Sequence, residues 1–166
     1  MKKLGKFDIE KMEREFKVLE NPEKILGGGF VSAYDINGGS ITNWEFMGYK
    51  YAVFTDASGK CIVLDGVNVV GCSPLASGNA GGGYFWNKIY VCDDYFGFDD
   101  LMHEYGHYMQ EQSMGSYSYY NTVAIPSVMS IFFKNENHMN MWTERIATFI
   151  GNMYASLYYG YPYTYP

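Results

Sequence analysis

The sequence predicts an α+β fold, because strand-like segments gather before residue 93 and helical patterns follow residue 99. The length of 166 residues suits one domain and leaves no room for a separate regulatory domain. The composition is that of a folded globule, since 48% of the residues are apolar and 18% are charged. We therefore expect a single domain over residues 1–166, with mainly strands over 30–93 and mainly helices over 99–158.

The first predicted element is an amphipathic helix over residues 8–20, within an N-terminal segment that ends near residue 26. Asp8 would cap this helix, and Pro22 would end it. A glycine run at residues 27–29 then marks a break. The apolar positions of the helix recur at helical spacing: Ile9, Met12, Phe16 and Leu19.

The strand signals follow this break. Residues 49–55 and 60–64 are rich in β-branched and aromatic side chains and flank a turn with aspartate, serine and glycine, so they predict a hairpin. A short strand at 67–70 follows, then a Gly/Ser/Asn loop over 74–83. Residues 84–86 and 88–91 again have strand composition.

The helical half begins at residues 99–114, where Asp99 and Asp100 would place negative charge at the positive end of the helix. We expect a Ser/Tyr loop at 115–120, an apolar helix at 122–133 entered through Pro126, and a polar turn at 134–140. A final helix over 141–158 precedes an aromatic tail, 159–166, that glycine and proline keep irregular.

The charge distribution argues against a nucleic-acid partner. The net charge is -6, from 18 acidic and 12 basic residues, and the only basic cluster is at the N-terminus. The longest apolar run, about residues 123–133, is too short to span a membrane. No apolar stretch follows the first lysines, so no signal peptide is indicated. We expect a soluble protein that is cytoplasmic or is secreted as part of a larger polypeptide.

Three cysteines, Cys61, Cys72 and Cys92, form no C-x-x-C pair, and one would stay unpaired if the other two were bridged. The prediction for them is buried free thiols that act as small apolar side chains.

The segment with a clear chemical signature is His103-Glu104-Tyr105-Gly106-His107. Two histidines four residues apart lie on one face of a helix, so both imidazoles can bind a single ion, and zinc suits such ligands. Glu104 projects beside the ion, where it can take a proton from a zinc-bound water that then attacks a carbonyl. The alternative is a helix that merely presents two hydrogen-bonded histidines.

A catalytic zinc takes a third protein ligand, and the sequence offers Glu144 or His138. We favour Glu144, because it precedes the small residue Ala147 by about one helical turn and the two helices could then approach closely. Glu144 could instead be an acidic residue in the first turn of the helix that interacts favourably with the helix dipole. His138 could be the ligand, a catalytic donor to the oxyanion, or a solvated loop histidine.

The motif followed by Glu144-Arg145-Ile146-Ala147 resembles the gluzincin arrangement of zinc metallopeptidases. With Ile125-Pro126-Ser127 and Trp142-Thr143-Glu144 added, the pattern resembles small metallopeptidase domains at the C-termini of bacterial Rhs-type polymorphic toxins, over roughly residues 84–155. The resemblance implies a zincin-like fold, in which a small twisted sheet with an edge strand packs on a metal-binding helix and a ligand-bearing helix follows.

By this resemblance Zn²⁺ would be held by His103, His107 and Glu144, with Glu104 as the base. The substrate would be a peptide or protein, and the chain could belong to a larger toxin or be bound by an immunity protein. Thermolysin-like sequences carry an aspartate where this chain has Thr148, so support for the histidines must come from elsewhere. Candidates for that support are Asp99, Asp100 and Gln110.

A zincin edge strand pairs with the substrate backbone, and our candidates for it are Gly83, Tyr84, Phe85 and Trp86. The glycine run at 81–83 would allow close approach to a substrate, or would be a plain flexible loop. The loop at 115–120 could be a lid over the site, or a connector.

Two other functions are compatible with the sequence: a non-catalytic zinc-containing binding module, and a zinc hydrolase of a non-peptide bond. Glu104 favours catalysis over the binding module, because a structural zinc needs ligands but no adjacent base.

Overall fold

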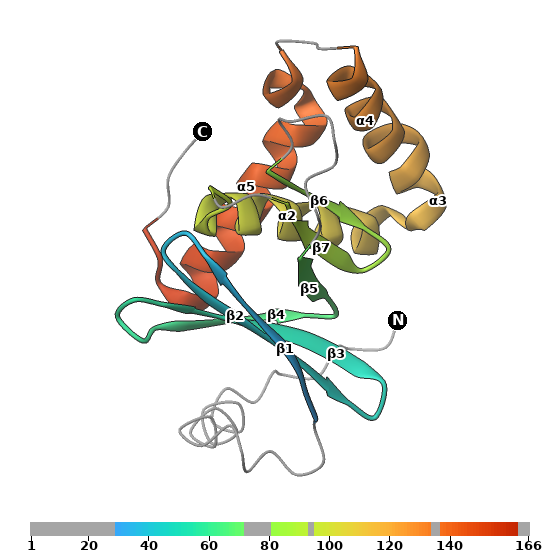
Figure 1. Ribbon diagram of the computed structural model, residues 1–166. Coiled ribbons are helices and arrows are strands. Elements are labelled where there is room, and N and C mark those ends of the chain that lie inside the picture. The colour runs from blue at the N-terminus through green and yellow to red at the C-terminus, as the bar shows by residue number, and fades with distance from the viewer. Residues whose placement is uncertain (1–28, 72–80, 93–94, 134–136, 163–166) are drawn as a thin grey trace, which may run out of the picture.

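The computed structural model describes residues 29–71, 81–92, 95–133 and 137–162. The predicted helix at 8–20 lies outside these residues. Within them, strands come first and helices follow, and the α+β class is confirmed (Figure 1).

The first sheet is an antiparallel meander with strand order β1-β2-β3-β4. The predicted hairpin at 49–64 is confirmed as β3 and β4, and its turn is held by the Asp56 carboxylate, which accepts hydrogen bonds from the backbone N–H groups of Ser58 and Lys60. The four strands are β1 (Gly29–Ile36), β2 (Gly39–Phe46), β3 (Tyr49–Asp56) and β4 (Cys61–Asp65).

The second sheet has the order β5-β7-β6, with β5 parallel and β6 antiparallel to the central β7. Strand β6 therefore lies at an edge. It begins at Gly82, so the predicted loop is wrong at Gly82 and Gly83, which pair with β7. The strands are β5 (Asn68–Gly71), β6 (Gly82–Phe85) and β7 (Lys88–Val91).

The helical half is α2 (Phe98–Met114), α3 (Ser116–Tyr119), the π-helix η3 (Tyr120–Ala124), α4 (Ile125–Phe132), the 3₁₀ turn η4 (His138–Asn140) and α5 (Trp142–Tyr159). The loop predicted at 115–120, from which a lid or a connector was expected, is wrong, because residues 116–119 form α3. Only Gly115 breaks the helix there, with φ of 80°, and the buried Tyr119 packs α3 against α2 through a ring contact with His107.

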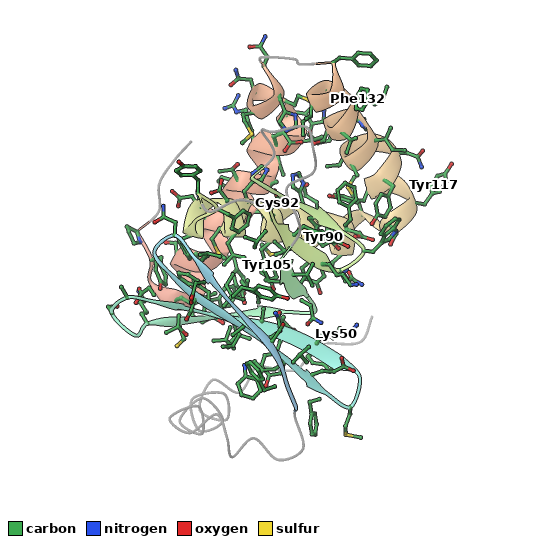
Figure 2. All side chains as sticks on the ribbon, viewed as in Figure 1. Lys50, Tyr90, Cys92, Tyr105, Tyr117 and Phe132 are labelled. Carbon is green, nitrogen blue, oxygen red and sulfur yellow. The ribbon has the colours of Figure 1, made fainter. Side chains whose placement is uncertain are left out.

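The core lies between the sheets and the pair α2 and α5, with Tyr105 near its centre (Figure 2). Apolar side chains from both sheets and from α2 form one cluster, in which Phe54, Ile89 and Leu101 are at most 1% exposed. The buried Asn43 joins the two sheets, because its amide exchanges two hydrogen bonds of 2.7 Å with the backbone of Val69.

The cysteine prediction is wrong at both described positions. Cys61 is a free thiol but is exposed, whereas Cys92 is buried but disulfide-bonded. Among the helices that the structure describes, none is long and apolar enough to cross a membrane.

Candidate metal centre

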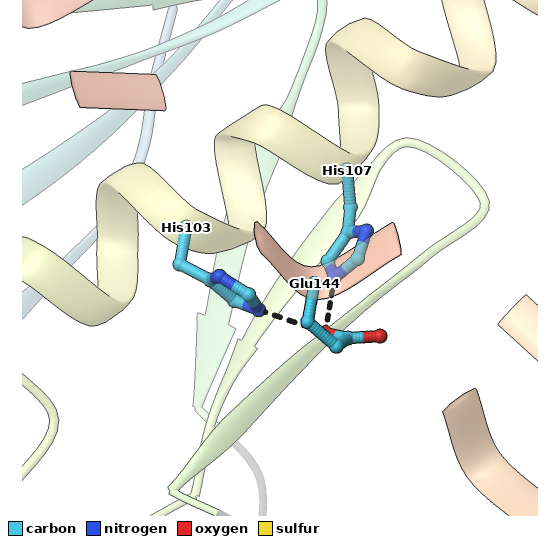
Figure 3. Close-up of side chains that lie close together, drawn as sticks. All are labelled: His103, His107 and Glu144. Carbon is cyan, nitrogen blue, oxygen red and sulfur yellow. Dashed lines mark hydrogen bonds and ion pairs between the residues drawn. The ribbon is translucent and has the colours of Figure 1, made fainter. Parts of the chain in front are cut away.

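Three predicted ligands converge on one point. His103 and His107 extend from successive turns of α2, and both direct Nε2 toward the same oxygen of Glu144 on α5 (Figure 3). The distances to Glu144 Oε2 are 3.2 Å from His103 and 3.1 Å from His107. All three ligand atoms lie within 4.8 Å of one another, so they could hold one metal ion.

Close contact between α2 and α5 brings Glu144 to the histidines. A Cβ atom at Gly106 would lie 2.0 Å from the carbonyl oxygen of Ala147, and one at Gly151 would lie 1.9 Å from that of Met102. The backbones of the two helices therefore touch at these glycines. The predicted close approach at Ala147 is confirmed. Gly106 and Gly151, each of which lies against the backbone of the other helix, were missed in the sequence. A glycine inside a helical pattern is a signal of such packing.

Gln110 fixes the tautomer of His107. Its amide nitrogen donates to the carbonyl of Thr143 (2.9 Å), so its oxygen faces His107 Nδ1 (2.8 Å) and must accept a hydrogen bond from the Nδ1–H group. Neutral His107 then carries a lone pair on Nε2, directed at the Glu144 carboxylate. The expectation that Gln110 would hydrogen-bond one of the two histidines is confirmed.

Thr148 does the same for His103, which corrects the expectation that this position lacks support. The Thr148 hydroxyl donates to the Glu144 carbonyl (3.1 Å), which leaves its oxygen to accept from His103 Nδ1 (2.8 Å). The candidates Asp99 and Asp100 are exposed, and the Asp100 carboxylate instead accepts from the Gly97 N–H at the start of α2. Thr148 itself therefore gives His103 the hydrogen-bond partner that was expected from elsewhere.

The donor set fits a metal ion. Ligand atoms at the corners of a tetrahedron with bonds of about 2.05 Å lie about 3.3 Å apart. The two distances to Glu144 are close to this value, and all three ligand atoms lie within 4.8 Å of one another. Without a cation, lone pairs on two neutral imidazoles and a carboxylate would face one another. Two nitrogens and one oxygen are also the ligand types that catalytic zinc takes.

The electrostatics of the cluster favour a positive charge at its centre. Burial acts to raise the pKa of Glu144, but hydrogen bonds from His103 and His107, once a proton is bound at Nε2, outweigh it and lower the pKa of the carboxyl group. Burial acts to lower the pKa of His107, yet the carboxylates of Glu144 and Glu104 outweigh it and raise the pKa. The cluster therefore attracts a cation, whether a proton or a metal ion.

Glu104 lies beside this cluster and is not one of its three ligands. Burial raises the pKa of its carboxyl group, and the nearby His103 and His107 only partly offset this effect. A carboxylate with a raised pKa is a better proton acceptor at neutral pH.

The structure brings His138 to the same cluster. It begins η4, and its Nε2 lies 3.9 Å from Glu144 Oε2. Its other ring nitrogen is hydrogen-bonded to the Ser130 hydroxyl, and the Ser127 hydroxyl is hydrogen-bonded to Glu144. Helix α4 therefore turns two serines toward the site, while Phe132 points away and is 81% exposed (Figure 2). Ser130 was missed, although serines three apart in an apolar helix mark a polar face.

The candidate substrate residues fall on β6 and on the turn that follows it. Gly83, Tyr84 and Phe85 belong to the edge strand, whereas Trp86 is in the turn and is 74% exposed. Tyr84 directs its side chain into the core, so its backbone alone faces a pairing partner. Gly82 serves packing, since a Cβ atom there would lie 2.3 Å from the Phe96 ring.

The fold and the site define an α+β protein with a candidate three-residue metal centre between two helices. Comparisons with protein-family models, with curated proteins and with solved structures found no match. The functional argument therefore rests on the residues of the site.

Proposed function

We propose that this chain is a zinc-dependent peptidase of the gluzincin type. The observation that supports the proposal best is the convergence of His103, His107 and Glu144 on one point, with Glu104 beside them as a fourth, non-ligating group. A purely structural zinc site would use its ligands without an adjacent base.

His103, His107 and Glu144 would hold the zinc, and their number leaves a position open for water or substrate. Zinc bound to these three ligands would lower the pKa of a water molecule in the open position and polarise the carbonyl group of the substrate. Thr148 and Gln110 would keep both imidazoles in the tautomer that presents Nε2.

Glu104 would accept the proton of the attacking water and pass it on to the leaving amine. Its raised pKa suits both steps, because the group must take up and release a proton near neutral pH. His138 would donate a hydrogen bond from Nε2 to the oxygen on which negative charge develops, with Ser130 holding its ring.

Peptides are the proposed substrates because the outer edge of β6, beside α2, pairs with no strand among the residues that the structure describes. An extended chain can pair with such an edge through backbone hydrogen bonds, which suits a polypeptide better than other substrates with a reactive carbonyl. An edge strand next to the metal-binding helix is also the zincin-like arrangement. That the chain acts as a toxin domain or is bound by an immunity protein stays a prediction.

The test is cleavage of a peptide library by the zinc-loaded protein and by Glu104→Gln. Glutamine keeps the shape of the side chain but cannot accept the proton, so we expect at least a hundredfold loss of activity with the zinc content unchanged. Glu45→Gln, an exposed substitution on β2, is the matched control and should stay active. Full activity of Glu104→Gln would contradict the proposal.

A further inference from the structure

Glu111 is a buried carboxylate to which the proposed hydrolysis gives no task. It lies on α2, four residues after His107, and is 6% exposed. Its Oε2 accepts a hydrogen bond of 2.6 Å from the hydroxyl of Tyr84, 27 residues earlier in the chain. Burying a charged group costs free energy that an apolar side chain would not cost, so the bond it makes needs an explanation.

Tyr84 connects this carboxylate to the edge strand β6. Its side chain is buried, and its hydroxyl also accepts the backbone N–H of Asn87 at 3.2 Å. Burial and the bond to Glu111 raise the pKa of Tyr84, so the hydroxyl keeps the proton that it donates. Glu111 therefore holds both the strand and the turn after it.

That turn requires holding, because both of its residues are in the left-handed region, Trp86 with φ of 50° and Asn87 with φ of 58°. A two-residue hairpin turn needs this geometry, but a tryptophan adopts it at a cost. A second hydroxyl, that of Tyr120, accepts the Trp86 backbone N–H at 3.0 Å. Two tyrosine hydroxyls thus fix the β6–β7 hairpin to the helical half of the molecule.

One face of α2 fixes both the metal ligands and this hairpin. His103, His107 and Glu111 are spaced by four residues, so they form a row along the helix with steps of about 6 Å. The first two meet Glu144, and the third meets Tyr84. The helix therefore sets where β6 lies along its axis relative to the candidate metal centre.

We infer that Glu111 is a positioning residue, which acts through Tyr84 to hold the edge strand where a peptide paired with β6 brings its scissile carbonyl to His103, His107 and Glu144. The inference rests on the proposed peptidase function and assigns a task to a residue outside the catalytic group. It predicts that the effect of losing the Glu111–Tyr84 hydrogen bond depends on substrate length, because only a substrate long enough to reach β6 depends on the position of that strand.

The test compares two substrates in Tyr84→Phe and Glu111→Met, each of which removes one partner of the hydrogen bond. The substrates are a peptide of about eight residues and a blocked dipeptide too short to pair with β6. Loss of a hydrogen bond to a buried carboxylate is worth about a factor of ten. We expect KM for the long peptide to rise about tenfold, with kcat and zinc content kept and the dipeptide kinetics unchanged. Tyr154→Phe is the control, since its hydroxyl donates to the Val63 carbonyl, away from the hairpin.

A second variant guards against misfolding of the first two. Tyr120→Phe removes the acceptor of the Trp86 N–H from a half-buried ring and should raise KM for the long peptide in the same selective way. Equal losses on both substrates, or no loss on either, would overturn the inference while leaving the peptidase function intact. A zinc-loaded wild-type protein inactive on both substrates would overturn the proposed function, and the inference with it.

Discussion

Gly106 on α2 lies against the carbonyl oxygen of Ala147 on α5, so closely that a methyl group at Gly106 would come within 2.0 Å of it. Glu144 lies one turn before Ala147 and reaches His103 and His107 only because the helices touch there. The candidate metal centre therefore depends on a residue that has no ligating atom.

Gly106→Ala should move α5 away from α2 and weaken both the fold and the metal site. Overpacking of this kind costs about 1–3 kcal/mol, and we expect urea unfolding to show a loss in this range together with weaker zinc binding. Gly29→Ala is the control, because nothing lies within 4 Å of a Cβ atom there. Unchanged zinc affinity in Gly106→Ala would mean that the ligands do not depend on this contact.

Thr148→Val should weaken zinc binding without unfolding the protein. Valine keeps the shape of threonine but cannot accept a hydrogen bond from His103 Nδ1. Loss of a hydrogen bond that orients a ligand histidine typically costs about tenfold or more in metal affinity. Competition with a chromophoric chelator measures the change. Thr122→Val removes a similar hydroxyl bond to a backbone carbonyl at an exposed position and should leave the affinity unaltered.

The contrast at Thr148 shows how far the sequence could predict the site. The spacing of His103 and His107 within a periodic helical segment was enough to predict α2 to within one residue, and Ala147 was enough to favour Glu144. The partner of His103 depends on which side chain α5 presents after docking. From the sequence, Thr148 indicates only that a carboxylate is absent at this position. The distance of 2.8 Å between its hydroxyl oxygen and His103 Nδ1 shows that it is the hydrogen-bond partner.

One segment was mispredicted because tertiary packing outweighed local composition. Residues 115–120 have the serine and tyrosine content of a loop, but Tyr119 is 1% exposed in α3 and its burial against His107 favours a helix. His138 lies within the predicted polar turn, and its position near Glu144 depends on Ser130 in α4, eight residues earlier. The contact of Tyr119 with His107 has no periodic signal in the sequence, whereas the spacing of Ser127 and Ser130 marks a polar face of α4.

Asn43→Ala should destabilise the whole fold. It removes both hydrogen bonds between the sheets and leaves the buried N–H and carbonyl of Val69 without partners, so we expect a loss of about 2–4 kcal/mol in urea unfolding. Asn121→Ala removes an exposed amide bond to the Tyr117 carbonyl and should cost less than about 1 kcal/mol. Similar losses in the two variants would contradict the role given to Asn43.

Removing the metal should lower thermal stability. A ligand present at about a thousand times its dissociation constant stabilises the folded state by about 4 kcal/mol, so a chelator should lower the Tm by about 10 °C and added zinc should restore it. His103→Ala should unfold at one temperature with and without zinc. A wild-type Tm that does not respond to the chelator would mean that no bound metal supports the fold.

The most direct test of the metal centre is elemental analysis of the native protein, purified without chelators. We expect about one equivalent of zinc per chain, and none above background in a double variant, His103→Ala with His107→Ala. A wild-type protein without any transition metal would contradict the central claim.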